Sequence, residues 1–139
     1  MDNSELLTIA QEYGTPTFVF DVEEFWRRLD KVADIFDDET RLCFAMKANP
    51  FLAGAAADHG IRLEVCSPGE LAICEDVGIS ANQIVYSGVN KQAEDVSRAI
   101  RYRVGVLTAE SKLHVELIEM CAARASTTVK VLLRLNSGS

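Results

Sequence analysis

The chain has 139 residues, of which 48% are hydrophobic and 25% are charged, as is ordinary for a soluble globular domain. Its formal net charge is −7, which argues against general nucleic-acid binding because no basic stripe is available to neutralise phosphates. No apolar run is long enough to span a membrane. The acidic first residues also lack the basic start and apolar middle of a signal peptide.

The four cysteines are Cys43, Cys66, Cys74 and Cys121. None of them forms a CxxC pair, so the sequence does not favour a zinc site. We expect four reduced, mostly buried thiols in a cytoplasmic protein.

Strand and helix patterns alternate along the chain. A short strand over 17–20 is expected after the turn signal at Gly14, and Asp21 is expected to cap a helix from Val22 to about Phe36. The later pattern predicts strands near 42–47, 61–66, 83–87, 104–108 and 129–135, and helices near 52–59, 68–77, 91–102 and 110–125.

Helix boundaries are marked by particular residues. Gly60 and Gly78 stand where the C-terminal caps of helices belong. Ser67 and Glu70 have the spacing of a capping box, with Pro68 at the first helical position. These signals indicate parallel strands connected by right-handed helical crossovers.

Two folds fit this alternation, the doubly wound sheet and the (β/α)8 barrel. The first strand-to-helix turn lacks a GxGxxG motif, which counts mildly against a dinucleotide-binding sheet. Each strand has a bulky apolar face and a mixed face of small or charged residues, whereas a doubly wound sheet would need both faces apolar. The pattern therefore favours an α/β fold that forms part of a (β/α)8 TIM-type barrel.

Side-chain alternation places three charged residues on the predicted barrel interior, namely Lys47, Glu64 and Arg134. Lys47 is expected at the C-terminal end of a buried strand, where a barrel presents its chemistry. Burial would shift such an amine towards its neutral, nucleophilic form. A structural ion cluster, or residues that reach solvent at an open rim, would explain the same pattern equally well.

Five segments resemble one family, in its order and at its spacing. They are Tyr13-Gly-Thr-Pro-Thr-Phe-Val-Phe-Asp21, Phe44-Ala-Met-Lys-Ala-Asn-Pro50, Leu63-Glu-Val-Cys-Ser-Pro-Gly-Glu-Leu71, Ile84-Val-Tyr-Ser-Gly-Val-Asn-Lys91 and Val131-Leu-Leu-Arg-Leu-Asn136. The chain resembles the N-terminal half of the fold type III pyridoxal-phosphate decarboxylases, which include diaminopimelate, ornithine and arginine decarboxylases. Alanine racemase is a more distant relative of this family.

The resemblance implies roles for four residues. Lys47 matches the lysine that binds pyridoxal 5'-phosphate covalently, and Glu64 falls where most members have an aspartate near that lysine. Arg134 matches an arginine that lines the pocket beneath the cofactor. Ala45, on the same face as Lys47, would leave room for the cofactor.

Several other polar residues are expected to have no part in the chemistry. We interpret Ser67 and Glu70 as helix caps rather than ligand contacts. For Lys91 a catalytic role is the alternative, but we interpret it as a helix-start or rim residue. His59 and His114 match no catalytic position of the family.

The resemblance also implies that residues 1–139 are a truncated part of an alanine-racemase-like barrel, with about five of its eight strands. The rest of the barrel, with its phosphate loop, and a C-terminal β-domain would be absent. The strand at 17–20 would belong with that β-domain. The parent is expected to be a homodimer that removes the α-carboxylate of a basic or diamino acid. We expect this chain alone to self-associate, to be inactive and to bind the cofactor weakly at most.

Three alternatives to the decarboxylase remain from the sequence. One is a racemase built on the same barrel. Another is a non-catalytic pyridoxal-phosphate-binding protein, against which the segment at Tyr13–Asp21 speaks because such proteins usually lack the β-domain. The third is an interaction domain, which would leave the inward charges unexplained.

Overall fold

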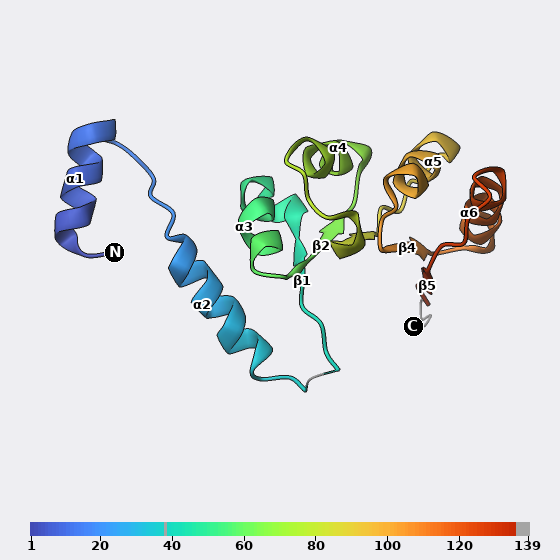
Figure 1. Cartoon of the computed structure of the whole chain (residues 1–139), viewed down its shortest axis with the longest axis horizontal. Coiled ribbons are helices and arrows are strands. Elements are labelled where there is room, and N and C mark those ends of the chain that lie inside the picture. The colour runs from blue at the N-terminus through green and yellow to red at the C-terminus, as the bar shows by residue number, and fades with distance from the viewer. Residues whose placement is uncertain (38, 136–139) are drawn as a thin grey trace. The chain divides into compact units, whose positions relative to one another are not determined.

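The structure is a computed structural model that describes residues 1–37 and 39–135. The chain divides into two compact units, Met1–Asp37 and Asp38–Ser139. The first unit contains two helices and the second contains all the strands (Figure 1). None of the helices in the described ranges combines the length and apolar character needed to cross a membrane.

The first helix, α1 (Asn3–Tyr13), was not predicted from the sequence. Asp2 caps it, because its Oδ1 atom accepts hydrogen bonds from the backbone N–H groups of Ser4 and Glu5. Glu5 completes a capping box by accepting from the backbone N–H of Asp2 at 2.7 Å. The spacing of Asp2 and Glu5 in the sequence is therefore typical of a helix N-terminus and could have predicted α1.

The predicted strand at 17–20 is wrong for this chain, because these residues form no strand in the structure. A strand needs a partner for its backbone groups, and the Phe18 side chain is fully exposed. The helix that follows, α2 (Val22–Ala33), begins as predicted, with the Asp21 carboxylate accepting from the N–H of Glu24. It ends at Ala33 rather than near Phe36.

The second unit contains a five-stranded parallel sheet whose spatial order, β1-β2-β3-β4-β5, is the order along the chain. Four α-helices and three 3-10 turns connect the strands, with the helices on one side of the sheet (Figure 1). This unreversed order is that of a (β/α)8 barrel rather than of a doubly wound sheet, and the predicted partial barrel is confirmed. The strands are β1 (Cys43–Ala45), β2 (Arg62–Val65), β3 (Ile84–Tyr86), β4 (Val106–Ala109) and β5 (Val131–Leu133). The connecting elements are η1 (Met46–Ala48), η2 (Pro50–Leu52), α3 (Ala53–Asp58), α4 (Pro68–Asp76), η3 (Ala81–Gln83), α5 (Ala93–Tyr102) and α6 (Lys112–Arg124).

The two faces of the sheet differ as the alternation predicted. On the outer face, Val65 is in register with Tyr86, and Tyr86 with Leu107; all three are buried. On the inner face, Glu64 is in register with Ala45 of β1 and with Val85 of β3. The core therefore lies between the sheet and its helices, and the inner face carries the small and charged residues.

The predicted helix boundaries are largely confirmed. Gly60 and Gly78 follow α3 and α4 with positive φ angles of 78° and 73°, a conformation that glycine adopts without steric cost. Ser67 caps α4 by accepting from the N–H of Glu70. The Glu70 carboxylate, however, accepts from the N–H of Cys66 at 2.7 Å, so α4 is tied back to the end of β2.

All four cysteines are free, as expected, but only Cys74 and Cys121 are buried, whereas Cys43 is exposed and Cys66 is partly exposed. The expectation of mostly buried thiols therefore holds for half of them. The Sγ atom of Cys74 lies 3.6 Å from the Sδ atom of Met46, in the core between α4 and the sheet.

The Cys74 thiol should make stability depend on alkaline pH. Burial, with the nearby Glu70 and Glu75 charges, raises its pKa from 9.0 to about 11. The unfolded thiol ionises first, so its stabilising contribution is complete below pH 9 and is lost as the pH rises towards 11. The loss is at most about 2.7 kcal/mol. Urea unfolding between pH 8 and 11 should show a smaller decline for Cys74→Ala than for the wild type; equal declines would contradict the prediction.

Candidate active site at the carboxyl ends of the strands

Lys47 does not end a buried strand. β1 stops at Ala45, and the chain turns into η1, which contains Lys47. Met46 is the fully buried residue of this turn, whereas Lys47 is exposed. The expected burial of Lys47 is therefore wrong, because the 3-10 turn breaks the two-residue alternation on which the expectation rested. The amine lies free of the core just beyond the carboxyl end of β1.

Glu64 lies beside β1 on the inner face, with Ala45 as its register partner. Its Oε1 atom accepts a hydrogen bond of 2.7 Å from the Ser87 hydroxyl. The Sγ atom of Cys66 lies 3.3 Å from the same hydroxyl oxygen. The site thus includes a residue, Ser87, that the sequence reasoning missed. The signal was available, since Ser87 has the same parity as Val85 on the inner face of β3.

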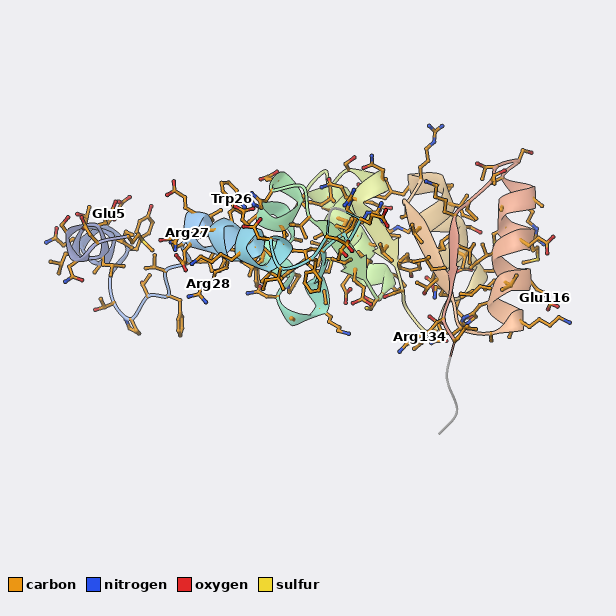
Figure 2. The ribbon with its side chains drawn as sticks, turned by 90° about the horizontal axis from the view of Figure 1, so that it is seen from below. Glu5, Trp26, Arg27, Arg28, Glu116 and Arg134 are labelled. Atoms are coloured by element: carbon orange, nitrogen blue, oxygen red, sulfur yellow. The ribbon has the colours of Figure 1, made fainter. Side chains whose placement is uncertain are left out.

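Arg134 directly follows β5, and its backbone N–H donates to the carbonyl of Ala109. Its side chain is exposed (Figure 2). β1 and β5 are the two edge strands of the sheet. Four strand-to-strand spacings, each of about 4.8 Å, separate them. Leu132, two residues before Arg134, is in register with Thr108. The structure does not bring the Arg134 side chain into contact with Lys47 or Glu64, so its predicted place beneath the cofactor stays a prediction.

Lys91 departs most from its predicted place, because its side chain is buried rather than at the rim. The ammonium donates to the carbonyl of Gly88 and to Thr108 Oγ1 at 3.3 Å, and it lies 3.5 Å from Glu110 Oε1. Burial lowers the pKa of Lys91, and the Glu110 carboxylate partly offsets this effect. Glu110 Oε2 in turn lies 2.8 Å from Nδ1 of His114, so His114 belongs to this polar cluster.

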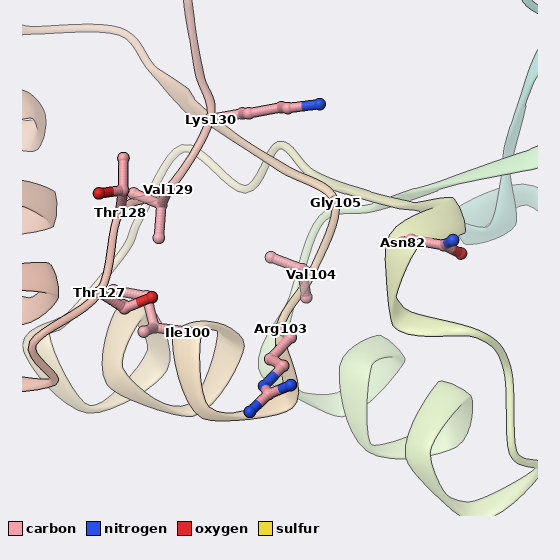
Figure 3. A pocket seen from close by; sticks show the side chains of 9 residues that line it. All are labelled: Asn82, Ile100, Arg103, Val104, Gly105, Thr127, Thr128, Val129 and Lys130. Carbon is pink, nitrogen blue, oxygen red and sulfur yellow. The ribbon is translucent and has the colours of Figure 1, made fainter.

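A cavity of about 450 Å³ opens at the other end of the strands (Figure 3). Its lining comes from the segments that precede β3, β4 and β5, with Val104, Thr127 and Val129 directed towards its centre and Lys130 at its edge. In a (β/α)8 barrel, chemistry belongs to the carboxyl ends, so this cavity is not part of the candidate site. No cluster of potential metal ligands occurs among residues 1–37 and 39–135.

The family of the chain follows from a match to a family model. Residues 21–139 match the model described as "Pyridoxal-dependent decarboxylase, pyridoxal binding domain". The chain belongs to this family. The predicted family resemblance is thereby confirmed.

Curated relatives in this pyridoxal-binding family include diaminopimelate decarboxylases. That of Mycobacterium tuberculosis is 33% identical over 137 residues, which cover 96% of this chain and 30% of the relative. That of Zymomonas mobilis is 33% identical over 142 residues, covering 98% and 34%. The chain therefore spans about a third of the length of these relatives.

Solved structures of amino-acid decarboxylases have the same fold. Diaminopimelate decarboxylase of M. jannaschii in co-complex with L-lysine superposes with a TM-score of 0.78 at 26% identity, covering 93% of this chain and 32% of that chain. Lysine/ornithine decarboxylase of Vibrio vulnificus complexed with putrescine has a TM-score of 0.75 at 18% identity, covering 95% and 36%. This second likeness supports the fold alone.

The residues at the carboxyl ends of β1 and β2 fit the cofactor that gives this family its name. An aldehyde requires an accessible amine, and Lys47 is exposed. The neighbouring inner face has a small side chain at Ala45 and a carboxylate at Glu64, held by the Ser87 hydroxyl.

Proposed function

We propose that this chain supplies the cofactor-binding lysine of a pyridoxal-phosphate-dependent amino-acid decarboxylase, and that the lysine is Lys47. The observation that carries the proposal is the exposed amine of Lys47 just after β1, next to the inner-face pair Ala45 and Glu64. When bound, the cofactor acts as an electron sink for the bond that breaks at the α-carbon. The relatives described above support loss of the α-carboxylate over racemisation or non-catalytic binding.

The protein's own residues would have separate tasks. Lys47 would hold the cofactor covalently through its amine, at the carboxyl end of β1. Glu64, oriented by Ser87, would present its carboxylate to the same face. Ala45 would leave the space above the sheet clear. Arg134, just after the edge strand β5, would line the pocket beneath the cofactor, as the resemblance implies.

The substrate class follows from the relatives. The names of the curated relatives and the complex of the M. jannaschii enzyme with L-lysine support a basic or diamino acid with an α-carboxylate. We also propose a cytoplasmic location, which the four free thiols support. Assembly into a homodimer, self-association of this chain and the assignment of residues 1–139 to one barrel domain stay predictions, which light scattering and limited proteolysis would check.

The proposal is tested by trapping the cofactor. The chain is titrated with pyridoxal phosphate, reduced with borohydride, digested and mapped by mass spectrometry. We expect saturable labelling at Lys47 above the background of the other four lysines, Lys31, Lys91, Lys112 and Lys130. Pyridoxamine phosphate, which has no aldehyde, is the control. The natural polypeptide that carries this sequence should release carbon dioxide from diaminopimelate, ornithine, lysine or arginine; saturable labelling elsewhere would overturn the assignment of Lys47.

A further inference from the structure

Lys91 is the one charged residue that is buried among the residues the structure describes, with 5% of its surface exposed. Burying a cation is unfavourable unless it is paired and hydrogen-bonded. Its acceptors come from two connections: Gly88 precedes α5, and Thr108 and Glu110 lie at the carboxyl end of β4. The amine therefore joins two neighbouring loops at the end of the sheet where Lys47 lies.

The Gly88 peptide that Lys91 holds lies directly against the end of β2. A Cβ atom added to Gly88 would be 2.3 Å from the carbonyl oxygen of Cys66, so the two backbones are in contact. The preceding residue, Ser87, donates its backbone N–H to the carbonyl of Val65 at 2.8 Å. The chain around Ser87 is thus fixed on one side by β2 and on the other by Lys91.

The side chain of Ser87 links this arrangement to the proposed cofactor site. Its hydroxyl donates to Glu64 at 2.7 Å, and the direction of that hydrogen bond depends on where the backbone holds Ser87. Removing the ammonium would leave the Gly88 carbonyl without its donor, and an unmade buried hydrogen bond is costly enough to shift a loop.

We propose that Lys91 is a positioning residue, which holds the Gly88 peptide against Cys66 and so keeps the Ser87 hydroxyl on the Glu64 carboxylate. Any effect of Lys91 on catalysis rests on the proposed function of Lys47. The contacts from Lys91 through Gly88 and Ser87 to Glu64 do not depend on that proposal. The Lys91 ammonium contacts Gly88, Thr108 and Glu110. It would therefore act on Glu64 only through the connection that contains Ser87 and Gly88. Glu110 holds the ammonium from the β4 side, and His114 lies against the other carboxylate oxygen of Glu110.

The test follows the side-chain carboxyl carbon of Glu64 by 13C NMR. Ser87→Ala removes the hydrogen bond and should shift this resonance. Lys91→Met, which keeps a long side chain without the charge, should shift it in the same direction by at least about half as much. The double variant should match Ser87→Ala alone, because both changes break the same contact. Lys112→Met, at an exposed lysine of α6, is the matched control and should leave the resonance in place.

A merely structural role for Lys91 would lower the unfolding midpoint without moving the Glu64 resonance, and that result in folded Lys91→Met would overturn the proposal. If Lys91→Met does not fold, Thr108→Val removes one acceptor of the ammonium and should give a smaller shift in the same direction; an unchanged resonance there would also overturn it. Cofactor trapping at Lys47 is measured separately. Failure of trapping with a Glu64 shift as expected would contradict the proposed function and leave the positioning role supported.

Discussion

Lys47→Ala is expected to abolish the saturable trapping of pyridoxal phosphate and to leave the fold intact. The side chain is exposed and follows β1 in a 3-10 turn, so its truncation opens no cavity in the core. Surface substitutions of this kind change the free energy of unfolding by about 0.5 kcal/mol or less. The amine, in contrast, is the atom that would bond to the cofactor, and alanine offers no replacement.

The matched control is Lys112→Ala, which removes an exposed amine from α6. It should retain full trapping at Lys47. Visible absorbance before reduction and mapped mass increments after reduction measure the effect, while circular dichroism checks the fold. Retained saturable trapping in Lys47→Ala, or an equal loss in both variants, would count against Lys47 as the cofactor lysine.

Gly88→Ala is expected to be among the most destabilising single-methyl changes in this chain. The added Cβ would lie 2.3 Å from the Cys66 carbonyl oxygen and 3.0 Å from its carbonyl carbon. Both are backbone atoms, which no side-chain rotation can move away, so the connection before α5 must separate from the end of β2. Overpacking in a well-packed region costs about 1–3 kcal/mol, and we expect the upper part of that range.

Gly54→Ala is the matched control, because a Cβ at Gly54 of α3 meets no atom within 4 Å. Alanine within a helix is favoured over glycine by about 0.5–1 kcal/mol, so this variant should be slightly more stable than the wild type. Urea unfolding at pH 7 measures both. If the two variants had the same midpoint, the close approach of Gly88 to Cys66 would be refuted.

The sequence predicted helix boundaries well where a capping residue or a glycine close in sequence determines them. Asp21, Ser67, Gly60 and Gly78 each mark a helix boundary that the structure confirms. The same logic would have found α1 through Asp2 and Glu5. The strand at 17–20 failed because β-structure requires a partner strand, which a local pattern cannot supply.

The sequence predicted which face of the sheet carries the candidate site, but it did not predict which side chains contact one another there. Alternation placed Glu64 and Arg134 on the inner side of the sheet, yet the sheet order separates β2 from the edge strand β5, which Arg134 directly follows. The burial of Lys91 could not be predicted from its neighbours in sequence, because its partners Thr108 and Glu110 lie at the carboxyl end of β4, 17 and 19 residues further along the chain. Contacts that depend on two loops converging need the three-dimensional arrangement.

The unreversed strand order also bears on how the sheet is built. Ala45 pairs with Glu64, Glu64 with Val85, and Thr108 with Leu132. Each strand therefore finds its partner roughly 20 residues away, which keeps the entropy cost of closing each connection small. During synthesis at about 5–20 residues per second, each new strand would meet a neighbour made only seconds earlier. The sheet can therefore grow from β1 towards β5 as the chain lengthens, with no strand waiting for a distant partner.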